Sequence, residues 1–226
     1  MALILNIDTA TDTASVSITA AGRSIGLLKS ENQKEHASFI HAAIASILKQ
    51  SELTLRQIEA VAVTAGPGSY TGLRVGMATA KGLCYALSKP LITVSTLEAM
   101  TIAALEMQST EDTLFCPMID ARRMEVFTAV FDSNMHHRMA PRAMVLEQGC
   151  FSNFLLTNKI LFFGNGSSKF KQIEKSINAS FADIFYSAEH VGKLAEAGFN
   201  NNNFSDVSYS QPMYLKEFYT VAKQKT

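Results

Sequence analysis

The sequence contains no tryptophan, only three cysteines, and no excess of charge of either sign, with 20 Lys and Arg against 20 Asp and Glu. Cys84, Cys116 and Cys150 are widely spaced and form no Cys-x-x-Cys pair, which argues against a disulfide scaffold and a zinc site. Because the net charge is zero, the chain has no basic footprint for tight, independent binding to nucleic acid. We therefore expect a cytoplasmic protein without a metal ion or cofactor of its own.

Long apolar stretches are also missing. The first apolar run is interrupted by Asn6 and Asp8, and no basic residues precede it. The sequence therefore predicts no signal peptide, no transmembrane segment and no membrane contact. The residues that are present, 47% hydrophobic and 18% charged in a chain of 226, suit a globular protein with one large domain or two small ones.

Common catalytic signatures do not occur either. The sequence has no His-Glu-x-x-His motif and no Gly-x-Ser-x-Gly nucleophile elbow. His36 and His41 are five residues apart, so on a helix they point about 140° away from each other, unlike the i, i+4 pair of a zinc site. These absences weigh against a peptidase, and the residues indicate no catalytic group.

The most distinctive stretch is residues 60–87. An uncharged apolar run at 60–64 predicts a buried strand, three glycines and a proline at 65–72 predict a sharp turn, and a helix is expected to about residue 87. Each glycine inside that helix costs about 1 kcal/mol relative to alanine, so close packing against the sheet and against a second helix or subunit is expected. Small residues form two rows on it, one of Gly72, Gly76, Ala80 and Cys84 and one of Ala78, Gly82 and Ala86.

The remaining pattern indicates a duplicated α/β protein. Alternation and helical periodicity predict the order β-β-β-α-β-α-β-α up to residue 107. Residues 118–131 then resemble 6–19, and residues 160–177 echo the strand, glycine turn and helix described above. We therefore expect a first half over residues 1–108 and a smaller second half over residues 109–226. No element is assigned to about thirty residues between Phe131 and Phe162, and the segment from Tyr209 to Tyr219 is expected to close the chain by returning to the first half.

Two interpretations of the turn residues stay open. Asp8 and Asp120 follow strands at corresponding places in the two halves, where they would either hold magnesium near a nucleotide or cap turns by hydrogen bonds. The glycine turn suits an anion, yet its spacing departs from the Gly-x-Gly-x-x-Gly and Walker fingerprints. A vestigial nucleotide site would comprise Asp8, Thr9, Gly66, Gly68, Ser69 and Asp120.

Four segments carry a family resemblance. They are Ile7-Asp8-Thr9, the run AGPGSYTGLRVG at 65–76, the run IDARRMEVF at 119–127, and Pro212-Met213-Tyr214-Leu215. Together they resemble the TsaB family, also called YeaZ, and the match spans the chain and is strongest over residues 1–130. One departure is Lys216, where the closing motif of the family often has arginine, which puts a forked contact with carboxylate or phosphate there in doubt.

The resemblance implies an actin/Hsp70-like, ribonuclease H-like fold of two mixed-sheet halves, the second reduced. It implies a non-catalytic scaffold, the dimerisation subunit for tRNA threonylcarbamoyladenosine modification beside the anticodon. The implied partners are the catalytic paralogue TsaD and the ATPase TsaE, with a homodimer when alone and tRNA contact only through the complex. The candidate interface residues, on two helices, are His36, Phe39, Ile40, Ala43, Ile44, Ile47, Gly72, Leu73, Gly76, Met77, Ala80, Leu83 and Cys84.

The alternative function is enzymatic. An ATP-dependent phosphotransferase or ATPase of the actin-like superfamily would use Asp8, the glycine turn and Asp120. The missing phosphate fingerprint weighs against it.

Overall fold

A computed structural model describes residues 2–31, 36–108 and 112–216 of the chain. In its first half, five strands form a mixed sheet in the order β3-β2-β1-β4-β5. The first three strands form an antiparallel meander, and β4 and β5 are added parallel to β1. These strands are β1 (Leu3–Asp8), β2 (Ala14–Ala20), β3 (Arg23–Ser30), β4 (Ala60–Gly66) and β5 (Leu91–Ser95).

The second half repeats this topology. Its sheet has the order β10-β9-β6-β7-β8, in which β6, β7 and β8 form the antiparallel meander and β9 and β10 are parallel to β6. The predicted duplication and the α/β class are therefore confirmed. The strands are β6 (Thr113–Asp120), β7 (Glu125–Phe131), β8 (His137–Val145), β9 (Lys159–Phe163) and β10 (Ala179–Ala182).

The second half is reduced in its helices. In the first half α1 (His36–Gln50) and α2 (Tyr70–Leu87) are long, whereas their counterparts α4 (Ser152–Leu155) and α5 (Ser167–Ile173) are short. The other helices are a 3₁₀ turn (Leu55–Gln57), α3 (Thr96–Met107) and α6 (Ala188–Asn200).

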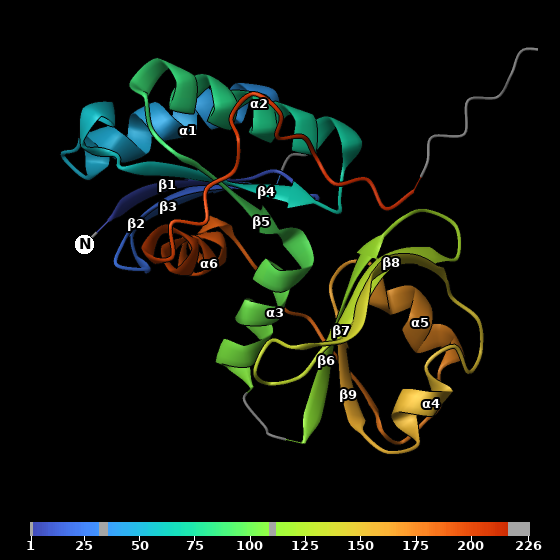
Figure 1. Cartoon of the computed structure of the whole chain (residues 1–226). Helices are drawn as coiled ribbons and strands as arrows, with labels where there is room; N and C mark the ends of the chain where they lie inside the picture. The colour runs from blue at the N-terminus through green and yellow to red at the C-terminus, as the bar shows by residue number, and fades with distance from the viewer. Residues whose placement is uncertain (1, 32–35, 109–111, 217–226) are drawn as a thin grey trace, which may run out of the picture.

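The helices cover both faces of each sheet (Figure 1). Helices α1 and α2 lie side by side on one face of the first sheet, and α6 covers its other face. Helix α3 packs on the second sheet through Leu97 and Met100, which contact Phe115 and Ile119, while α4 and α5 cover the opposite face. The hydrophobic cores thus lie between these layers, and the two halves meet around α3 and the ends of β1 and β6.

Two expectations from the sequence need correction. The second half does not extend from residue 109 to the end of the chain, because α6 packs on β1 and β2 of the first half through Val191 and Ala195. Residues 205–216, which we name the strap, also lie on the first half, since Ser205 pairs with Leu91 and the Lys81 ammonium donates to the Ser210 carbonyl at 2.9 Å. The unassigned stretch contains β8 and α4.

Candidate functional site

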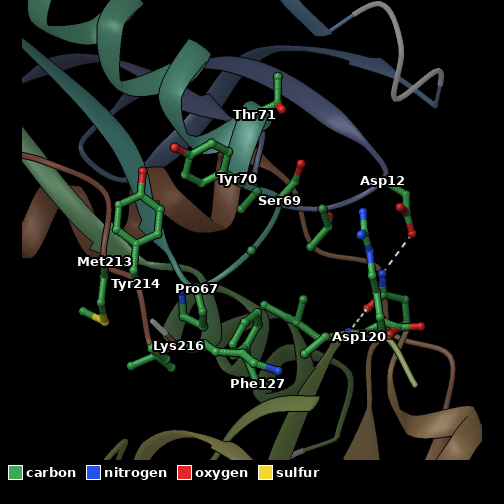
Figure 2. A pocket seen from close by; sticks show the side chains of 18 residues that line it. Asp12, Pro67, Ser69, Tyr70, Thr71, Asp120, Phe127, Met213, Tyr214 and Lys216 are labelled. Atoms are coloured by element: carbon green, nitrogen blue, oxygen red, sulfur yellow. Dashed lines mark hydrogen bonds between the residues drawn. The ribbon is translucent and has the colours of Figure 1, made fainter. Parts of the chain in front are cut away.

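A cleft of about 460 Å³ lies between the two halves (Figure 2). One wall is formed by residues 10–12 after β1 and residues 67–71 between β4 and α2. The facing wall is formed by residues 119–122 and Phe127, and residues 213–216 of the strap lie beside the opening. The three predicted nucleotide-binding residues that line this cleft are Gly68, Ser69 and Asp120.

The glycine-rich turn brings α2 against the loop after β1. A β-carbon on Gly68 would lie 2.2 Å from the Ala10 carbonyl oxygen, and one on Gly72 would lie 2.0 Å from that of Thr9. The Ser69 amide donates to the Ala10 carbonyl at 2.7 Å, and Ser69 Oγ accepts from the Gly72 amide as the N-cap of α2. The glycines therefore permit a close approach of two backbone segments of the same chain.

Asp8 is buried behind the cleft wall and does not line the cleft. Its carboxylate is 1% exposed, and Oδ1 accepts hydrogen bonds from Thr64 Oγ1 at 2.8 Å, the Ala10 amide at 3.2 Å and the Tyr186 hydroxyl at 3.3 Å. Burial raises the pKa of Asp8 to about 6, and these donors only partly offset that cost. Tyr186 reaches Asp8 from the segment between β10 and α6 and is one of the residues that cover this carboxylate.

The other two predicted nucleotide residues are also engaged inside the chain. Thr9 is buried, and its hydroxyl donates to the Gly72 carbonyl at 2.7 Å. Gly66 has φ +118°, and a β-carbon there would lie 2.8 Å from the Met213 carbonyl oxygen of the strap. Neither lines the cleft. The expectation that Asp8, Thr9 and Gly66 face a bound nucleotide is therefore corrected, because their polar groups serve internal contacts.

Asp120 anchors the facing wall as a turn cap and an ion pair. Its Oδ1 accepts from the Arg122 amide at 2.6 Å and from the Lys169 ammonium at 2.5 Å. Its own amide donates to Asn165 Oδ1 at 2.9 Å, and the Asn165 amide group donates to Asp12 Oδ2 across the cleft at 2.9 Å. The turn-cap interpretation thus describes the contacts of Asp120, and Asn165 links the two halves beside it.

The strap ties the halves together at the opening. The Met213 amide donates to the Ala65 carbonyl at 2.7 Å, which fixes the strap at the carboxyl end of β4. Lys216 forms an ion pair with Glu125 of β7. A contact with a carboxylate is therefore made at this position although lysine replaces the arginine that is frequent in the family. Residues 217–219, expected to close the chain, lie outside the described residues.

The aromatic side chains at the opening were assigned no role from the sequence, although Tyr70 and Tyr214 lie in two of the segments that carry the family resemblance. Tyr70 and Tyr214 face each other with ring centroids 5.5 Å apart, and the Arg74 guanidinium carbon lies 3.9 Å from the centre of the Tyr70 ring. Tyr70 belongs to the glycine-rich run, which offered a local signal. Tyr214 and Tyr186 reach the site from the strap and the segment before α6, so no local pattern could have placed them.

Most predicted interface residues belong to the core of the chain. They lie on the faces of α1 and α2 that pack on the first sheet, and a β-carbon on Gly76 would lie 2.4 Å from Thr9 Oγ1. This corrects the expectation that they contact a partner, because their own sheet already covers them. Phe39 and Leu83 are only partly buried, and the His36 side chain lies outside the described residues. The buried ones are Ile40, Ala43, Ile44, Ile47, Gly72, Leu73, Gly76, Met77, Ala80 and Cys84.

The opposite faces of α1 and α2 carry exposed small residues. Ala42 and Ala45 are exposed on α1, and Ala78, Gly82 and Ala86 are exposed on α2, where they form the second small-residue row. No atom lies within 4 Å of a β-carbon built on Gly82. We name these five residues the helix-pair surface. Their small, exposed side chains allow another helix to approach closely. The row of Gly72, Gly76, Ala80 and Cys84 cannot do so, because it is buried against the first sheet.

The described residues offer few other sites. They contain no group of three or more His, Cys, Asp or Glu side chains placed to hold a metal ion. A search of the same residues for a helix with the length and hydropathy of a membrane span found none.

Comparison with known proteins places this fold in the actin-like class, with two ribonuclease H-like halves. An activator of the 2-hydroxyisocaproyl-CoA dehydratase from Clostridium difficile, solved with bound ADPNP, superposes with a TM-score of 0.54 at 7% identity, over 89% of this chain and 97% of that one. A structure described as an uncharacterized protein with similarity to peptidase YeaZ from Pseudomonas aeruginosa gives a TM-score of 0.84 at 23% identity, over 96% of this chain and all of the other.

Sequence relatives give the family. The family model described as TsaD, tRNA N6-adenosine threonylcarbamoyltransferase, matches residues 13–216. The tRNA threonylcarbamoyladenosine biosynthesis protein TsaB of Haemophilus influenzae is 31% identical over 97% of this chain and 96% of its own length. The chain therefore belongs to the family of that model and, within it, to the TsaB (YeaZ) group of tRNA threonylcarbamoyladenosine biosynthesis proteins.

Proposed function

We propose that the chain is a non-catalytic scaffold for the tRNA N6-threonylcarbamoyladenosine modification beside the anticodon, and that it acts by binding the catalytic paralogue TsaD. The observation that carries the proposal is the helix-pair surface, whose small, exposed residues lie on two adjacent helices. Two helices approach to 8–10 Å when the side chains between them are small, so a matching helix pair can complete a four-helix contact. A standard interface of this kind buries about 800 Å² per partner.

The state of Asp8 supports a scaffold over the alternative, an ATP-dependent phosphotransferase or ATPase. Such an enzyme needs an open carboxylate for magnesium, whereas the Asp8 carboxylate is buried under Tyr186 and accepts three hydrogen bonds from neutral groups. The proposal therefore assigns no catalytic residue to this chain. Purified chain alone should hydrolyse no ATP in the presence of magnesium.

The same surface defines the proposed partners. Without TsaD, the helix-pair surface of one copy is expected to cover that of a second copy, giving a homodimer. With TsaD, the heterodimer replaces it, the ATPase TsaE joins the complex, and tRNA is contacted only through the assembly, since this chain has a net charge of zero.

The experiment is a matched pair of alanine-to-leucine substitutions. Ala78→Leu adds bulk to the helix-pair surface, whereas Ala197→Leu makes the same chemical change at an exposed position of α6. We expect Ala78→Leu to weaken co-elution with TsaD at least tenfold and to remove the homodimer in sedimentation, with an unchanged melting temperature. Ala197→Leu should leave both associations intact. If Ala78→Leu protein still co-elutes with TsaD at the wild-type affinity, the scaffold proposal fails.

A further inference from the structure

The opening of the cleft carries exposed apolar side chains that the core does not use. Tyr70, Met124, Met213 and Tyr214 are each between 38% and 43% exposed. Three of them line the cleft, and Met124 belongs to the β6–β7 turn beside Arg122, which lines it as well. Figure 2 shows Tyr70, Tyr214 and Met213 around one side of the opening.

Three arginines stand around the same opening. Arg74 lies over the Tyr70 ring and donates to the Tyr214 hydroxyl at 3.1 Å, and Arg122 and Arg123 are exposed in the turn between β6 and β7. Within the described part of the chain, no ion pair joins any of the three to a carboxylate. Of the neighbouring acids, Asp120 and Glu125 are already paired with lysines, so among the described residues Asp12 is the one lining carboxylate left to set against the three arginines. Positive charge is therefore left unbalanced at the rim.

The backbone of the turn adds an independent observation. In this connection of four residues, 121–124, Arg122 and Arg123 have φ values of 70° and 51°, in the left-handed region that favours glycine and asparagine. Arginine at both positions is conformationally unfavourable, and unfavourable backbone geometry of this kind concentrates at positions where the side chains have a use. The turn presents two guanidinium groups at the tip of a hairpin, next to the apolar side chains.

We propose that this opening, formed by the apolar residues Tyr70, Met124, Met213 and Tyr214 and the arginines Arg74, Arg122 and Arg123, is a docking surface for an acidic, partly apolar segment of a partner protein. Tyrosine, methionine and arginine are the residue types enriched in protein interfaces. A segment of the chain already lies along this opening, because residues 213–216 of the strap line the cleft. The exposed guanidinium groups of Arg122 and Arg123 fit carboxylates, which arginine binds in a forked geometry.

A protein segment fits better than single-stranded RNA, although exposed aromatic rings and arginines suit both. RNA carries a phosphate on every nucleotide, and a strand along this cleft would pass the carboxylate of Asp12 as well as the arginines. A peptide can carry its acids only opposite the arginines and place apolar side chains between the tyrosines and methionines. The docking surface does not depend on the helix-pair surface.

The test measures fluorescence anisotropy of a labelled peptide in which glutamates alternate with leucine and phenylalanine, added to the full chain. A glutamine version of the peptide and a labelled oligouridine are the comparison probes. The double variant Arg122→Glu with Arg123→Glu should bind the glutamate peptide at least tenfold more weakly than wild type, because two attractive charges become repulsive. Lys171→Glu with Lys175→Glu makes the same change of net charge on and after α5 and should bind like wild type.

Further variants keep the result interpretable. Arg122→Lys with Arg123→Lys retains the charge and should recover most of the binding, and melting temperatures confirm that each variant folds. Ala78→Leu should leave peptide binding unchanged, so failure of the scaffold proposal is distinguishable from failure of this one. The docking surface is refuted if wild type does not bind the glutamate peptide, if the arginine variant binds as tightly as wild type, or if oligouridine binds more tightly than the peptide.

Discussion

Asp8 shows how one side chain limits the chemistry of the cleft. The carboxylate ends β1 beside the cleft, yet Tyr186 from the other half donates to it, and Thr64 fills another side. Burial also raises the pKa of the Tyr186 hydroxyl, so this phenol stays a donor at neutral pH. Both groups are therefore engaged with each other, and their contact helps to keep the Asp8 carboxylate buried behind the cleft wall.

Asp8 should make the stability of the protein depend on pH. The folded carboxyl, with a pKa of about 6, binds its proton more tightly than the unfolded carboxyl at 3.8. The stabilisation that the protonated Asp8 carboxyl adds to the free energy of unfolding is therefore fully present below about pH 4. It is lost as the pH rises through 6, and the loss amounts to about 3 kcal/mol. Asp8→Asn keeps an oxygen for the three donors and does not ionise. Chemical unfolding from pH 4 to 7 should show the variant gaining stability relative to wild type, and a constant difference would contradict the assigned environment.

Helix α2 separates two kinds of small residue. The row that includes Gly72 and Gly76 lets the helix approach the loop after β1, and the row that includes Ala78 and Gly82 faces outward. Both rows have the same i, i+4 spacing, so the helical period predicts that two faces are close-packed but cannot tell which face meets the sheet. Which row faces the sheet is decided by the close contact between Gly72 and Thr9, and these two residues are 63 positions apart in the chain.

Two glycine-to-alanine substitutions should therefore have opposite effects. A β-carbon at position 72 would lie 2.0 Å from the Thr9 carbonyl oxygen, so Gly72→Ala must displace backbone and is expected to destabilise the fold by about 3 kcal/mol. At position 82 a β-carbon meets nothing, so Gly82→Ala should stabilise it by about 1 kcal/mol through helix propensity. Denaturant unfolding measures both. Equal effects of the two changes would mean that the rows are wrongly assigned.

At the scale of the whole molecule, the repetition and the return of the closing segment to the first half could be predicted, and the other connections between the halves could not. The pair Asp8 and Asp120 and the two glycine turns revealed the duplication, because each half repeats its own local pattern. The return of α6 to the first sheet had no local signal, since its apolar face would suit either half. The contacts of Tyr186, Asn165 and the strap also depend on how distant segments meet.

These connections make one body of the two halves and leave the outward side of α1 and α2 uncovered. Asn165 and Lys216 link the halves at the cleft. Along its length the strap contacts Leu91, then Lys81 and finally Glu125. The cleft is thereby braced by internal contacts, and the helix-pair surface stays free for a partner. The scaffold proposal follows from this division of the molecule.

Hydrogen–deuterium exchange of the chain alone and in the presence of TsaD tests that proposal most directly. Binding across the helix-pair surface should slow amide exchange in residues 36–50 and 70–87, because a covered helix opens less often. Exchange in β8 and α5, on the far half, should not change. Unchanged exchange in both helices, with slowing confined to residues 119–125 and 213–216, would contradict the account and place the partner in the cleft.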